Sequence, residues 1–530
     1  MDIGRALQWT AERHPDRPAV GGERSYTWRE WDARTNRIAR ALGALGATKG
    51  ERVCLCMSNG EAMAATHLAS QKLGVLSTPL NSRYAPDELA YCLEDAAPTV
   101  VVSDDATADL VRAALEAMDP DGRTFALLHD GEDRPDGADG FADAVAAQSD
   151  AAIDVEVGPD DPSVMLYTAG TTGRPKGVPR TQRNEHSAAE AHVIQARYGP
   201  REATLGAMPM YHTMGLRSLL AMVVLGGKFV AIPDFKPPRA LELIDAEEVT
   251  ALYLVPTAFW ALAQEGGLAE AGRCVRRLAY AGAAMTPTLC AKLQETLAPD
   301  VFVNHYGSTE IYTFCVEDDA AARPGSAGRP GLHSRIRLVR ADGEERVGPD
   351  DLVEPGETGE IIASTRSPEA FQGYWHRPEA DERALRDGWY FTGDLGHVDE
   401  HGRLSVSGRV DDMIITGGEN VHPLEVEDAL ARCPDVGEVA VAGVDEDRWG
   451  HAVTAFVVAA DGAPPEASAR RIADWVRGES GLTAYKRPKR IVVLDAIPKS
   501  PVGKILRRKL VAGDYDALGE ADTARRTEGA

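Results

Sequence analysis

The chain has 530 residues, of which 44% are hydrophobic and 26% are charged, and its formal net charge is -25. This composition is ordinary for a globular protein, and the length predicts several domains' worth of core. The acidic excess excludes general binding of nucleic acids or anionic membranes, because both need clustered Lys and Arg.

The cysteines and the apolar segments indicate a cytoplasmic protein. The seven cysteines are scattered without a CxxC pair, which is typical of a reducing compartment. Residues 1–18 predict an amphipathic helix and a turn, without the apolar segment of a signal peptide. The longest apolar stretch, Leu219–Ile232, is interrupted by Gly226 and Gly227 and is too short to span a bilayer.

The first three quarters of the chain alternate strand-like and helix-like segments. Such alternation predicts parallel sheets covered by helices. The glycine-punctuated segments 357–365 and 403–415 predict shorter strands in a small barrel-like subdomain. The other expected strands are 52–57, 75–79, 99–103, 228–232, 251–255, 277–280 and 301–304, with helices over 61–72 and from Pro86, and an acidic loop over 130–140.

A domain boundary is expected at GRVDD, residues 408–412. Beyond it, helices at 423–431 and 466–477 and strands at 438–443, 453–459 and 490–494 form a compact α+β pattern. The polar stretch after about Gly513 is expected to be frayed. We therefore predict an α/β fold with a large N-terminal domain, residues 1–410, and a small mobile C-terminal domain, residues 411–530.

The most informative segment is Tyr167–Gly177, YTAGTTGRPKG, which follows the apolar run Ser163–Leu166. Its glycines allow tight turns, and successive N–H groups in such a turn form an anion-binding nest. It is not a Walker A loop, because the spacing to a Gly-Lys-Ser/Thr element is absent. On composition alone, a flexible surface loop is an equal alternative. The candidate phosphate-binding residues are Thr168, Gly170, Thr171, Thr172, Gly173 and Lys176.

This segment resembles the signature of the adenylate-forming superfamily, which includes acyl-CoA synthetases, adenylation domains of peptide synthetases and firefly luciferase. The superfamily usually has Ser at the position of Ala169, so one hydroxyl donor is replaced here. Further superfamily motifs follow in order, and the resemblance extends from about Arg24 to Leu510. They are YGSTE at 306–310, WYFTGD at 389–394, GRVDD at 408–412, GGEN at 417–420 and PKSPVGK at 498–504.

The resemblance implies ATP binding and acyl-adenylate formation. Thr309 is implied to contact the α-phosphate and Glu310 to hold Mg²⁺, for which a hard carboxylate is a suitable ligand. Asp394 is implied to accept hydrogen bonds from the ribose hydroxyls, with Arg409 beside it. Lys504 is the implied catalytic lysine. The other implied nucleotide contacts are Ala281, Gly282, Tyr306, Gly307 and Ser308, and the implied interdomain hinge is Asp411.

Within the superfamily, the resemblance is closest to benzoate-type ligases such as 4-chlorobenzoate–CoA ligase. It is carried by MPMYH at 208–212, VPT at 255–257, GRVDDMIITGGENVHP at 408–423 and KRPKR at 486–490. The implied acyl pocket consists of His212, Thr213, Met214, Tyr253, Ala281, His305, Gly307, Ile311 and Tyr312, with His212 also implied in catalysis. For each apolar member, an ordinary core position is the alternative.

The implied pocket is more polar than that of the relative. Tyr253, His305 and Tyr312 add polar tips, and Arg217 follows the His212 motif closely. We therefore expect a hydroxylated or amino-substituted aryl acid, or a cyclic acid.

A separate set of residues is implied to bind coenzyme A. An indole stacks on adenine, and cations suit the 3′-phosphate. A solvated basic cluster is the alternative for the cations. The implied residues are Gly418, Glu419, Trp449, Tyr485, Arg487 and Lys489.

We expect an ATP-dependent carboxylate–CoA ligase that forms acyl-AMP and pyrophosphate, then acyl-CoA and AMP. Its cofactor is Mg²⁺, and ATP and coenzyme A are co-substrates. Three alternatives stay open: an adenylation enzyme that loads a carrier protein, a medium-chain fatty acid–CoA ligase, and a non-catalytic sensor of ATP or acyl-AMP. The intact Glu310, Asp394, Arg409 and Lys504 argue against the sensor. The sequence leaves a homodimer open.

Overall fold

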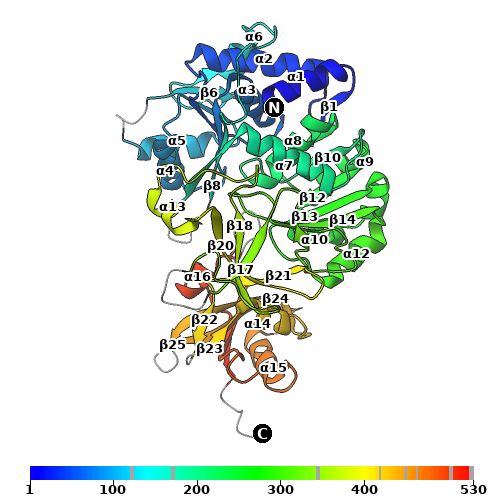
Figure 1. Ribbon diagram of the computed structural model, residues 1–530, viewed down its shortest axis with the longest axis vertical. Coiled ribbons are helices and arrows are strands. Elements are labelled where there is room, and N and C mark those ends of the chain that lie inside the picture. Colours follow the sequence, from blue (N-terminus) through cyan, green and yellow to red (C-terminus); the bar gives the residue numbers. More distant parts are fainter. Residues whose placement is uncertain are drawn as a thin grey trace. The chain divides into compact units, whose positions relative to one another are not determined.

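The structure is a computed structural model that describes residues 1–119, 124–168, 174–341, 347–416, 419–446, 450–460, 464–499 and 505–523. The chain forms two compact units (Figure 1). Unit 1 comprises Met1–Ile336 and Ala363–Tyr390, and unit 2 comprises Arg337–Ile362 and Phe391–Ala530.

Unit 1 contains a seven-stranded sheet that ends in an antiparallel hairpin. Its strands pair in parallel from β7 to β8, and β9 then returns antiparallel to β8. Its central strands are buried and apolar, as expected for a sheet covered on both faces. The order is β7 (Asp139–Gly140), β6 (Ala126–Asp130), β5 (Val100–Asp104), β3 (Arg52–Cys56), β4 (Leu76–Pro79), β8 (Pro162–Thr168) and β9 (Lys176–Thr181).

A second sheet of unit 1 has nine strands. The strands from β1 to β14 along this sheet pair in parallel, and antiparallel strands flank them at both ends. In Figure 1, β12, β13 and β14 lie side by side in the green part of the chain. The order is β16 (Arg329–Pro330), β15 (Cys315–Glu317), β14 (Val301–Tyr306), β13 (Arg277–Ala281), β12 (Ala251–Leu254), β10 (Ala203–Gly206), β11 (Lys228–Ala231), β1 (Pro18–Gly21) and β2 (Tyr26–Thr27).

The helices of unit 1 begin at sequence signals for helix starts. Thr27 and Thr181 form capping boxes, and several other helices have proline in the first turn. The helices are α1 (Ile3–Arg13), α2 (Trp28–Ala44), α3 (Glu61–Leu73), α4 (Pro86–Ala96), α5 (Ala108–Ala117), α6 (Phe141–Ala146), α7 (Gln182–Gln195), α8 (Thr213–Leu225), α9 (Pro237–Ala246), α10 (Pro256–Glu265), α11 (Leu268–Ala271), α12 (Pro287–Leu297) and α13 (Pro378–Ala384), with a 3₁₀ helix at Gly272–Cys274.

A third sheet has five strands, and β20 pairs antiparallel with both β19 and β21 in it. It corresponds to the segment for which the sequence predicts a barrel-like subdomain. Its strands are β17 (Ile336–Val339), β18 (Gly359–Ser364), β20 (Trp389–Val398), β19 (Leu385–Arg386) and β21 (Leu404–Arg409), which pairs with β20.

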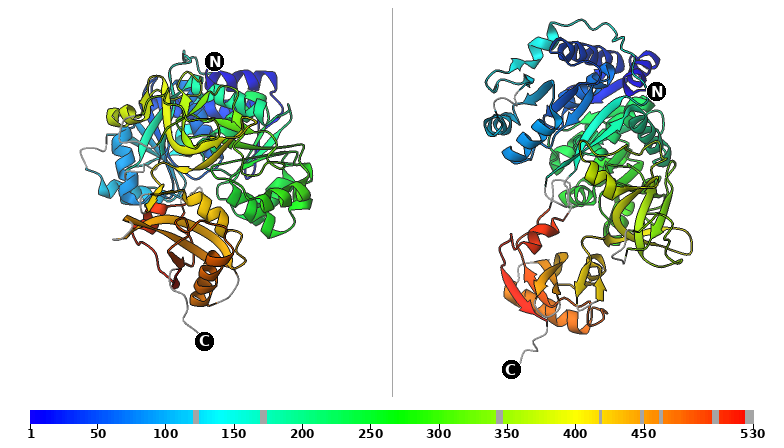
Figure 2. Two further views of the ribbon diagram at one scale, coloured as in Figure 1. Left: turned by 60° about the horizontal axis from the view of Figure 1, so that its bottom comes forward. Right: turned by 60° about the vertical axis from the view of Figure 1, so that its left-hand side comes forward.

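The C-terminal part of unit 2 is a six-stranded sheet with helices, drawn in orange and red in Figure 2. Its core is a cluster of buried apolar side chains from α14, α15, β24, β25 and β26. The strands are β23 (Glu419–Val421), β22 (Ile414–Thr416), β25 (Gly450–Ala459), β26 (Arg490–Val493), β27 (Gly519–Asp522) and β24 (Val436–Glu446), and the helices are α14 (Pro423–Leu430), α15 (Pro465–Gly478) and α16 (Arg507–Val511).

The fold class and most element positions agree with the sequence prediction, including the alternating strands of unit 1 and the α+β C-terminal pattern. One prediction is wrong. The stretch after Gly513 is not frayed throughout, because Gly519–Asp522 forms β27, antiparallel to β26. Its polar side chains hide a strand that is held by backbone pairing.

Two further sequence expectations can be compared with the structure. The strand expected at 52–57 is present as β3, and its Cys54 and Cys56 are buried. No helix in the described part of the chain combines the length and the apolar character that crossing a bilayer requires.

Candidate active site

The predicted phosphate loop connects β8 to β9. The register pairs Thr168 with Lys176 across this hairpin, and the Thr168 hydroxyl donates to the Lys176 carbonyl at 3.4 Å. Strand pairing therefore brings the two described ends of the loop together. Gly170, Thr171, Thr172 and Gly173 lie outside the described residues.

Lys176, Tyr374 and Glu310 form a chain of contacts in unit 1. The Nζ of Lys176 lies 4.4 Å from the centre of the Tyr374 ring, within cation–π range. The Tyr374 hydroxyl donates to Oε1 of Glu310 at 2.7 Å. Glu310 is only 7% exposed, and burial, followed by the Glu310 charge, raises the pKa of Tyr374. The cation of the predicted phosphate loop and the carboxylate of the YGSTE motif are thus held around one phenol.

Arg180, at the other end of β9, supports the backbone of the YGSTE motif. Its Nη1 donates to the carbonyls of Thr309 and Glu310 at 3.1 and 3.2 Å. Its Nε donates to Glu185 Oε1 at 2.5 Å, and both side chains of this pair are fully buried. From the other side, the Phe371 N–H donates to the Glu310 carbonyl at 2.9 Å. The position of Glu310 is therefore fixed through its main chain.

Gly307 allows this motif to turn tightly. A Cβ at this position would lie 2.1 Å from the Tyr312 carbonyl oxygen, so no other residue fits without a shift. The Ser308 N–H donates to the Ile311 carbonyl at 3.0 Å and closes the turn. The turn places Glu310 directly after the end of β14.

The surroundings of Glu310 fit a Mg²⁺ ion. Mg²⁺ keeps several waters and is commonly bound by one or two carboxylates together with substrate phosphates. The Tyr374 hydroxyl orients the Glu310 carboxylate by donating to its Oε1. Among the described residues, no group of three or more His, Cys, Asp or Glu side chains could form a complete protein cage for a metal. A shared site with phosphate oxygens is the arrangement that these residues suit.

Three predicted acyl-pocket residues lie on one face at the carboxyl ends of parallel strands. Ala281 pairs in register with His305, and Tyr253 pairs with Ala279, two residues earlier on β13. Since side chains alternate along a strand, Tyr253, Ala281 and His305 share a face. Such strand ends are common ligand sites in α/β folds.

Aromatic rings gather on this face. The His192 ring, from α7, lies 4.6 Å from the Tyr253 ring and 5.1 Å from the His305 ring. Burial lowers the pKa of His305 and His192 well below the ordinary value, and the Arg217 charge lowers both further. Both imidazoles are therefore neutral at neutral pH.

Buried charges adjoin these rings. Arg217, from α8, donates to the Thr313 hydroxyl and lies 3.8 Å from Glu369 Oε2. The Arg180 guanidinium stacks over the Tyr312 ring at 3.5 Å, and the Tyr312 hydroxyl donates to Glu185 Oε2 at 3.2 Å. The predicted pocket residues Tyr253, His305 and Tyr312 are thus set among two arginines and two glutamates.

The other predicted acyl-pocket residues have different surroundings. His212 is the N-cap residue of α8, and burial lowers its pKa to about 4. Thr213 and Met214 begin α8, with Met214 buried. Ile311 packs in a separate apolar cluster with Val178 and Phe371. Within the described part of the chain, the ring contacts of His305 involve His192 and Tyr253 and include neither His212 nor Ile311.

In unit 2, Asp394 and Arg409 face each other across the β20–β21 pair. Their register is direct, and Arg409 Nη1 donates to Asp394 Oδ1 at 2.7 Å. The same nitrogen donates to the Thr392 carbonyl at 3.3 Å. Gly393, which lies between Thr392 and Asp394 in the chain, has a φ of 70°, a backbone conformation that favours glycine. Asp394 and Arg409, which the sequence predicts to lie at the ribose, are therefore in direct contact with each other.

The residues predicted to bind coenzyme A also lie in unit 2. Tyr485 is 38% exposed, Arg487 Nε donates to the Leu482 carbonyl at 3.0 Å, and Lys489 Nζ donates to the Ala484 carbonyl at 3.3 Å. Glu419 lies in β23. Gly418, Trp449 and the predicted catalytic Lys504 lie outside the described residues.

The predicted hinge residue Asp411 is exposed in the turn after β21. Its neighbour Asp412 pairs with Arg507 at 3.2 Å, and Arg507 also pairs with the buried Glu427 of α14 at 2.6 Å. The segment after β21 is therefore tied to the C-terminal helices within unit 2.

Sequence reasoning missed four residues that organise the site: Arg180, Glu185, Glu369 and Tyr374. In the sequence, Arg180 resembles an ordinary solvent-facing residue of a short strand. The one feature that could have indicated a role in the site is its position on the strand that follows the phosphate loop. Tyr374 belongs to none of the sequence motifs.

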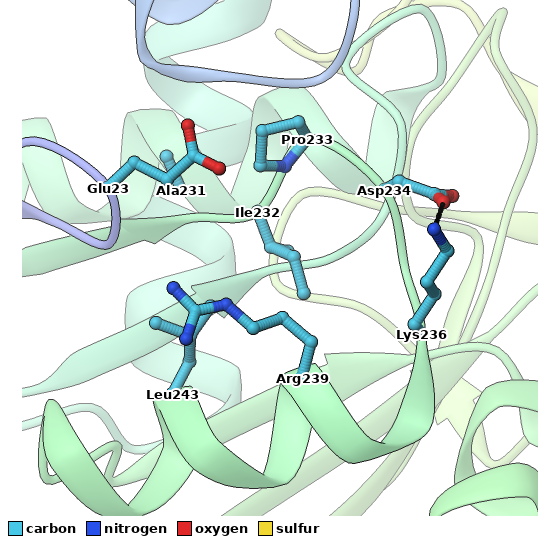
Figure 3. A pocket seen from close by; sticks show the side chains of 8 residues that line it. All are labelled: Glu23, Ala231, Ile232, Pro233, Asp234, Lys236, Arg239 and Leu243. Atoms are coloured by element: carbon cyan, nitrogen blue, oxygen red, sulfur yellow. Dashed lines mark ion pairs between the residues drawn. The ribbon is translucent and has the colours of Figure 1, made fainter.

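A surface hollow of about 160 Å³ lies apart from these residues, at the carboxyl end of β11 (Figure 3). It contains an ion pair between Asp234 and Lys236 at 3.3 Å, and both side chains are largely exposed. It includes none of the predicted site residues. Its lining is Glu23, Ala231, Ile232, Pro233, Asp234, Lys236, Arg239 and Leu243.

Comparison with known proteins gives consistent matches over nearly the whole chain. The family model "AMP-binding enzyme" matches residues 7–375, and "AMP-binding enzyme C-terminal domain" matches residues 425–504. A long-chain-fatty-acid–CoA ligase of Mycobacterium tuberculosis is 34% identical over 489 residues, 91% of this chain and 92% of that protein. A 4-chlorobenzoate–CoA ligase of an Arthrobacter species is 32% identical over 517 residues, 95% of this chain and 94% of that protein. The crystal structure of an anthranilate CoA ligase in complex with anthranoyl-AMP has a TM-score of 0.87 at 26% identity and covers 97% of both chains.

Proposed function

Because this chain belongs to the AMP-binding enzyme family and is an ATP-dependent, AMP-forming acid–CoA ligase, we propose that its acid is an aryl or cyclic carboxylate. The observation that carries this proposal is the ring-lined face at the ends of β12 and β14, where His192 contacts both Tyr253 and His305. Rings and charged groups suit a flat, polar-substituted ring better than a long alkyl chain. The relatives named for chlorobenzoate and anthranilate support the same choice.

In the first half-reaction, an oxygen of the acid attacks the α-phosphate of ATP, and the bond to pyrophosphate breaks. Both reactants are anions, so the barrier falls when cations neutralise the charge and hold the atoms in line. We assign Lys504 to the acid and the α-phosphate, Lys176 to the leaving pyrophosphate, and Asp394 with Arg409 to the ribose. Mg²⁺ at Glu310, when bound, supplies further charge neutralisation at the phosphates.

In the second half-reaction, the thiol of coenzyme A attacks the acyl carbonyl, and AMP leaves. The proposed thiol-side residues are Gly418, Glu419, Trp449, Tyr485, Arg487 and Lys489. Lys504 is needed for the first step and must leave for the second, so we propose that residues after Asp411 rotate between the steps.

A substrate panel tests the proposed acid. Pyrophosphate release is measured with benzoate, hydroxybenzoates, aminobenzoates, cyclohexanecarboxylate, octanoate and palmitate at saturating ATP and coenzyme A. We expect aryl or cyclic acids to give the highest kcat/KM. Activity confined to the alkyl acids would overturn the proposal. Replacing coenzyme A by a holo-carrier protein in the same assay tests the acceptor, and faster transfer to coenzyme A is expected.

A further inference from the structure

Unpaired buried polar atoms concentrate in one cluster of rings and charges, formed by His305, His192, Arg217, Tyr312, Arg180 and Glu369. Thirteen buried side-chain nitrogen and oxygen atoms of the described residues have no hydrogen-bond partner, and six belong to this one cluster. Buried polar atoms are nearly always paired, so such a concentration requires an explanation. The six atoms are both ring nitrogens of His305, Nδ1 of His192, Nε of Arg217, Nη2 of Arg180 and Oε2 of Glu369.

His305 has the largest unused capacity in this cluster. Its side chain is 2% exposed, and neither ring nitrogen is paired among the described residues. A neutral imidazole offers one donor and one acceptor. The same face holds Ala281, which lies directly beside His305 in register and has only a methyl side chain.

The charges of the cluster already balance. Arg180 pairs with Glu185, and Arg217 lies 3.8 Å from Glu369. Glu369 also contacts His333, whose Nδ1 lies 3.3 Å from Glu369 Oε1. A further full charge on a ligand would lack a counter-ion here, and burying an uncompensated charge is costly. A neutral group that both donates and accepts matches the unused atoms.

We propose that the acid carries a hydroxyl group away from its carboxylate, and that His305 together with Arg217 hydrogen-bonds this hydroxyl and selects for it. This inference rests on the proposed acyl pocket. It narrows the hydroxylated, amino-substituted or cyclic acids expected from the sequence to the hydroxylated ones, and it names the residues that recognise the hydroxyl. An amino substituent donates in the same way but accepts poorly, so it ranks second.

The test measures a ratio within each variant. The kcat/KM for adenylation is measured by ATP–pyrophosphate exchange with benzoate and with its 2-, 3- and 4-hydroxy derivatives. In the unaltered protein, we expect one hydroxy isomer to exceed benzoate by roughly 10-fold to 100-fold, the range for one buried hydrogen bond that is otherwise left unmade. In His305→Leu, this ratio falls to about one, and in His305→Asn, part of it returns because the amide restores a donor and an acceptor.

His67→Asn is the matched control. His67 is a buried histidine with one unpaired ring nitrogen that lies in α3, outside the cluster. Its replacement is expected to leave the ratio unchanged. Because the ratio compares two acids in one variant, a general loss of folded protein cancels.

Two outcomes are distinguishable. If benzoates are inactive and alkyl acids active, the proposed function fails. If benzoates are active but no hydroxy isomer is preferred, or if His305→Leu keeps the preference, the inference fails alone, and the unpaired atoms bind only water.

Discussion

The hydroxyl of Tyr374 donates a 2.7 Å hydrogen bond to Oε1 of Glu310. This bond orients the carboxylate that is proposed to hold Mg²⁺. We predict that Tyr374→Phe lowers the rate of ATP–pyrophosphate exchange roughly tenfold, as expected for the loss of about 1.5 kcal/mol from a hydrogen bond to a charged group. The Mg²⁺ concentration for half-maximal rate should rise as well, which a magnesium titration measures.

Tyr167→Phe is the control for this prediction. The Tyr167 hydroxyl donates to Asp95 Oδ2 at 2.8 Å, so its loss also removes a phenol–carboxylate bond. We expect Tyr167→Phe to lower the free energy of unfolding about as much as Tyr374→Phe does, but to leave the Mg²⁺ concentration for half-maximal rate unchanged. An equal magnesium shift in both variants would show that Tyr374 acts only through stability.

Lys504→Ala should separate the two half-reactions. We expect it to abolish acyl-adenylate formation and largely to spare thioester formation from synthetic acyl-AMP, because only the first step joins two anions. Rapid-quench assays of each step give the answer. Lys499→Ala, which removes a lysine paired with Glu438, serves as the control. Equal loss in both half-reactions would contradict the assignment of Lys504.

Asp394→Asn should reduce the preference of the enzyme for ATP over deoxy-ATP. If Asp394 accepts from the ribose hydroxyls, the unaltered protein prefers ATP over 2′-deoxy- or 3′-deoxy-ATP by roughly tenfold for each lost bond. The variant should narrow that preference, as measured by kcat/KM for each nucleotide. Asp399→Asn, in an exposed turn of the same unit, should keep it. A preference that survives in Asp394→Asn would exclude this role.

The buried Arg180–Glu185 pair gives a prediction about stability. Glu185→Leu should lower the free energy of unfolding by about 3 to 5 kcal/mol, because it leaves the buried Arg180 without its counter-ion. The double variant Arg180→Met, Glu185→Leu should be less destabilised than the single one, which urea unfolding measures. Its adenylation should stay low, since the carbonyls of Thr309 and Glu310 lose their donor. Recovery of both properties would show that Arg180 does not position the motif.

His67 gives a pH-dependent prediction. Burial lowers its pKa to about 3, from 6.5 in the unfolded chain. Below pH 6.5, the unfolded state therefore binds more protons, and stability falls as the pH falls. Relative to His67→Asn, the unaltered protein should lose about 2 kcal/mol between pH 7 and pH 5. Urea unfolding of both proteins at the two pH values measures this difference, and a pH-independent difference would contradict it.

The sequence predicted most of the fold because its signals are local. Apolar β-branched runs such as Val100–Asp104 and proline or threonine at helix starts determine elements without help from distant residues. β27 escaped prediction because GEAD has no strand propensity of its own and forms only by pairing with β26.

Candidate site residues can be named from the sequence where they stand in ordered motifs, as Glu310, Asp394 and Arg409 do. Contacts that join distant segments cannot be predicted in this way. Tyr374 lies 64 residues from Glu310, and Arg180 lies 130 residues from the same motif. Only tertiary structure brings such pairs together, and their residue types carry no signal in isolation.

β27 also protects the C-terminal sheet. It covers the free edge of β26, whose Ile491, Val492 and Val493 are buried, and the Thr523 hydroxyl donates to the Pro488 carbonyl just before that strand. A chain shortened at Gly513 would leave this edge open to pairing with another molecule, a known route to aggregation. An expression tag should therefore be added after Thr523 and should not replace β27. Proteolysis that removes β27 should make the protein aggregate.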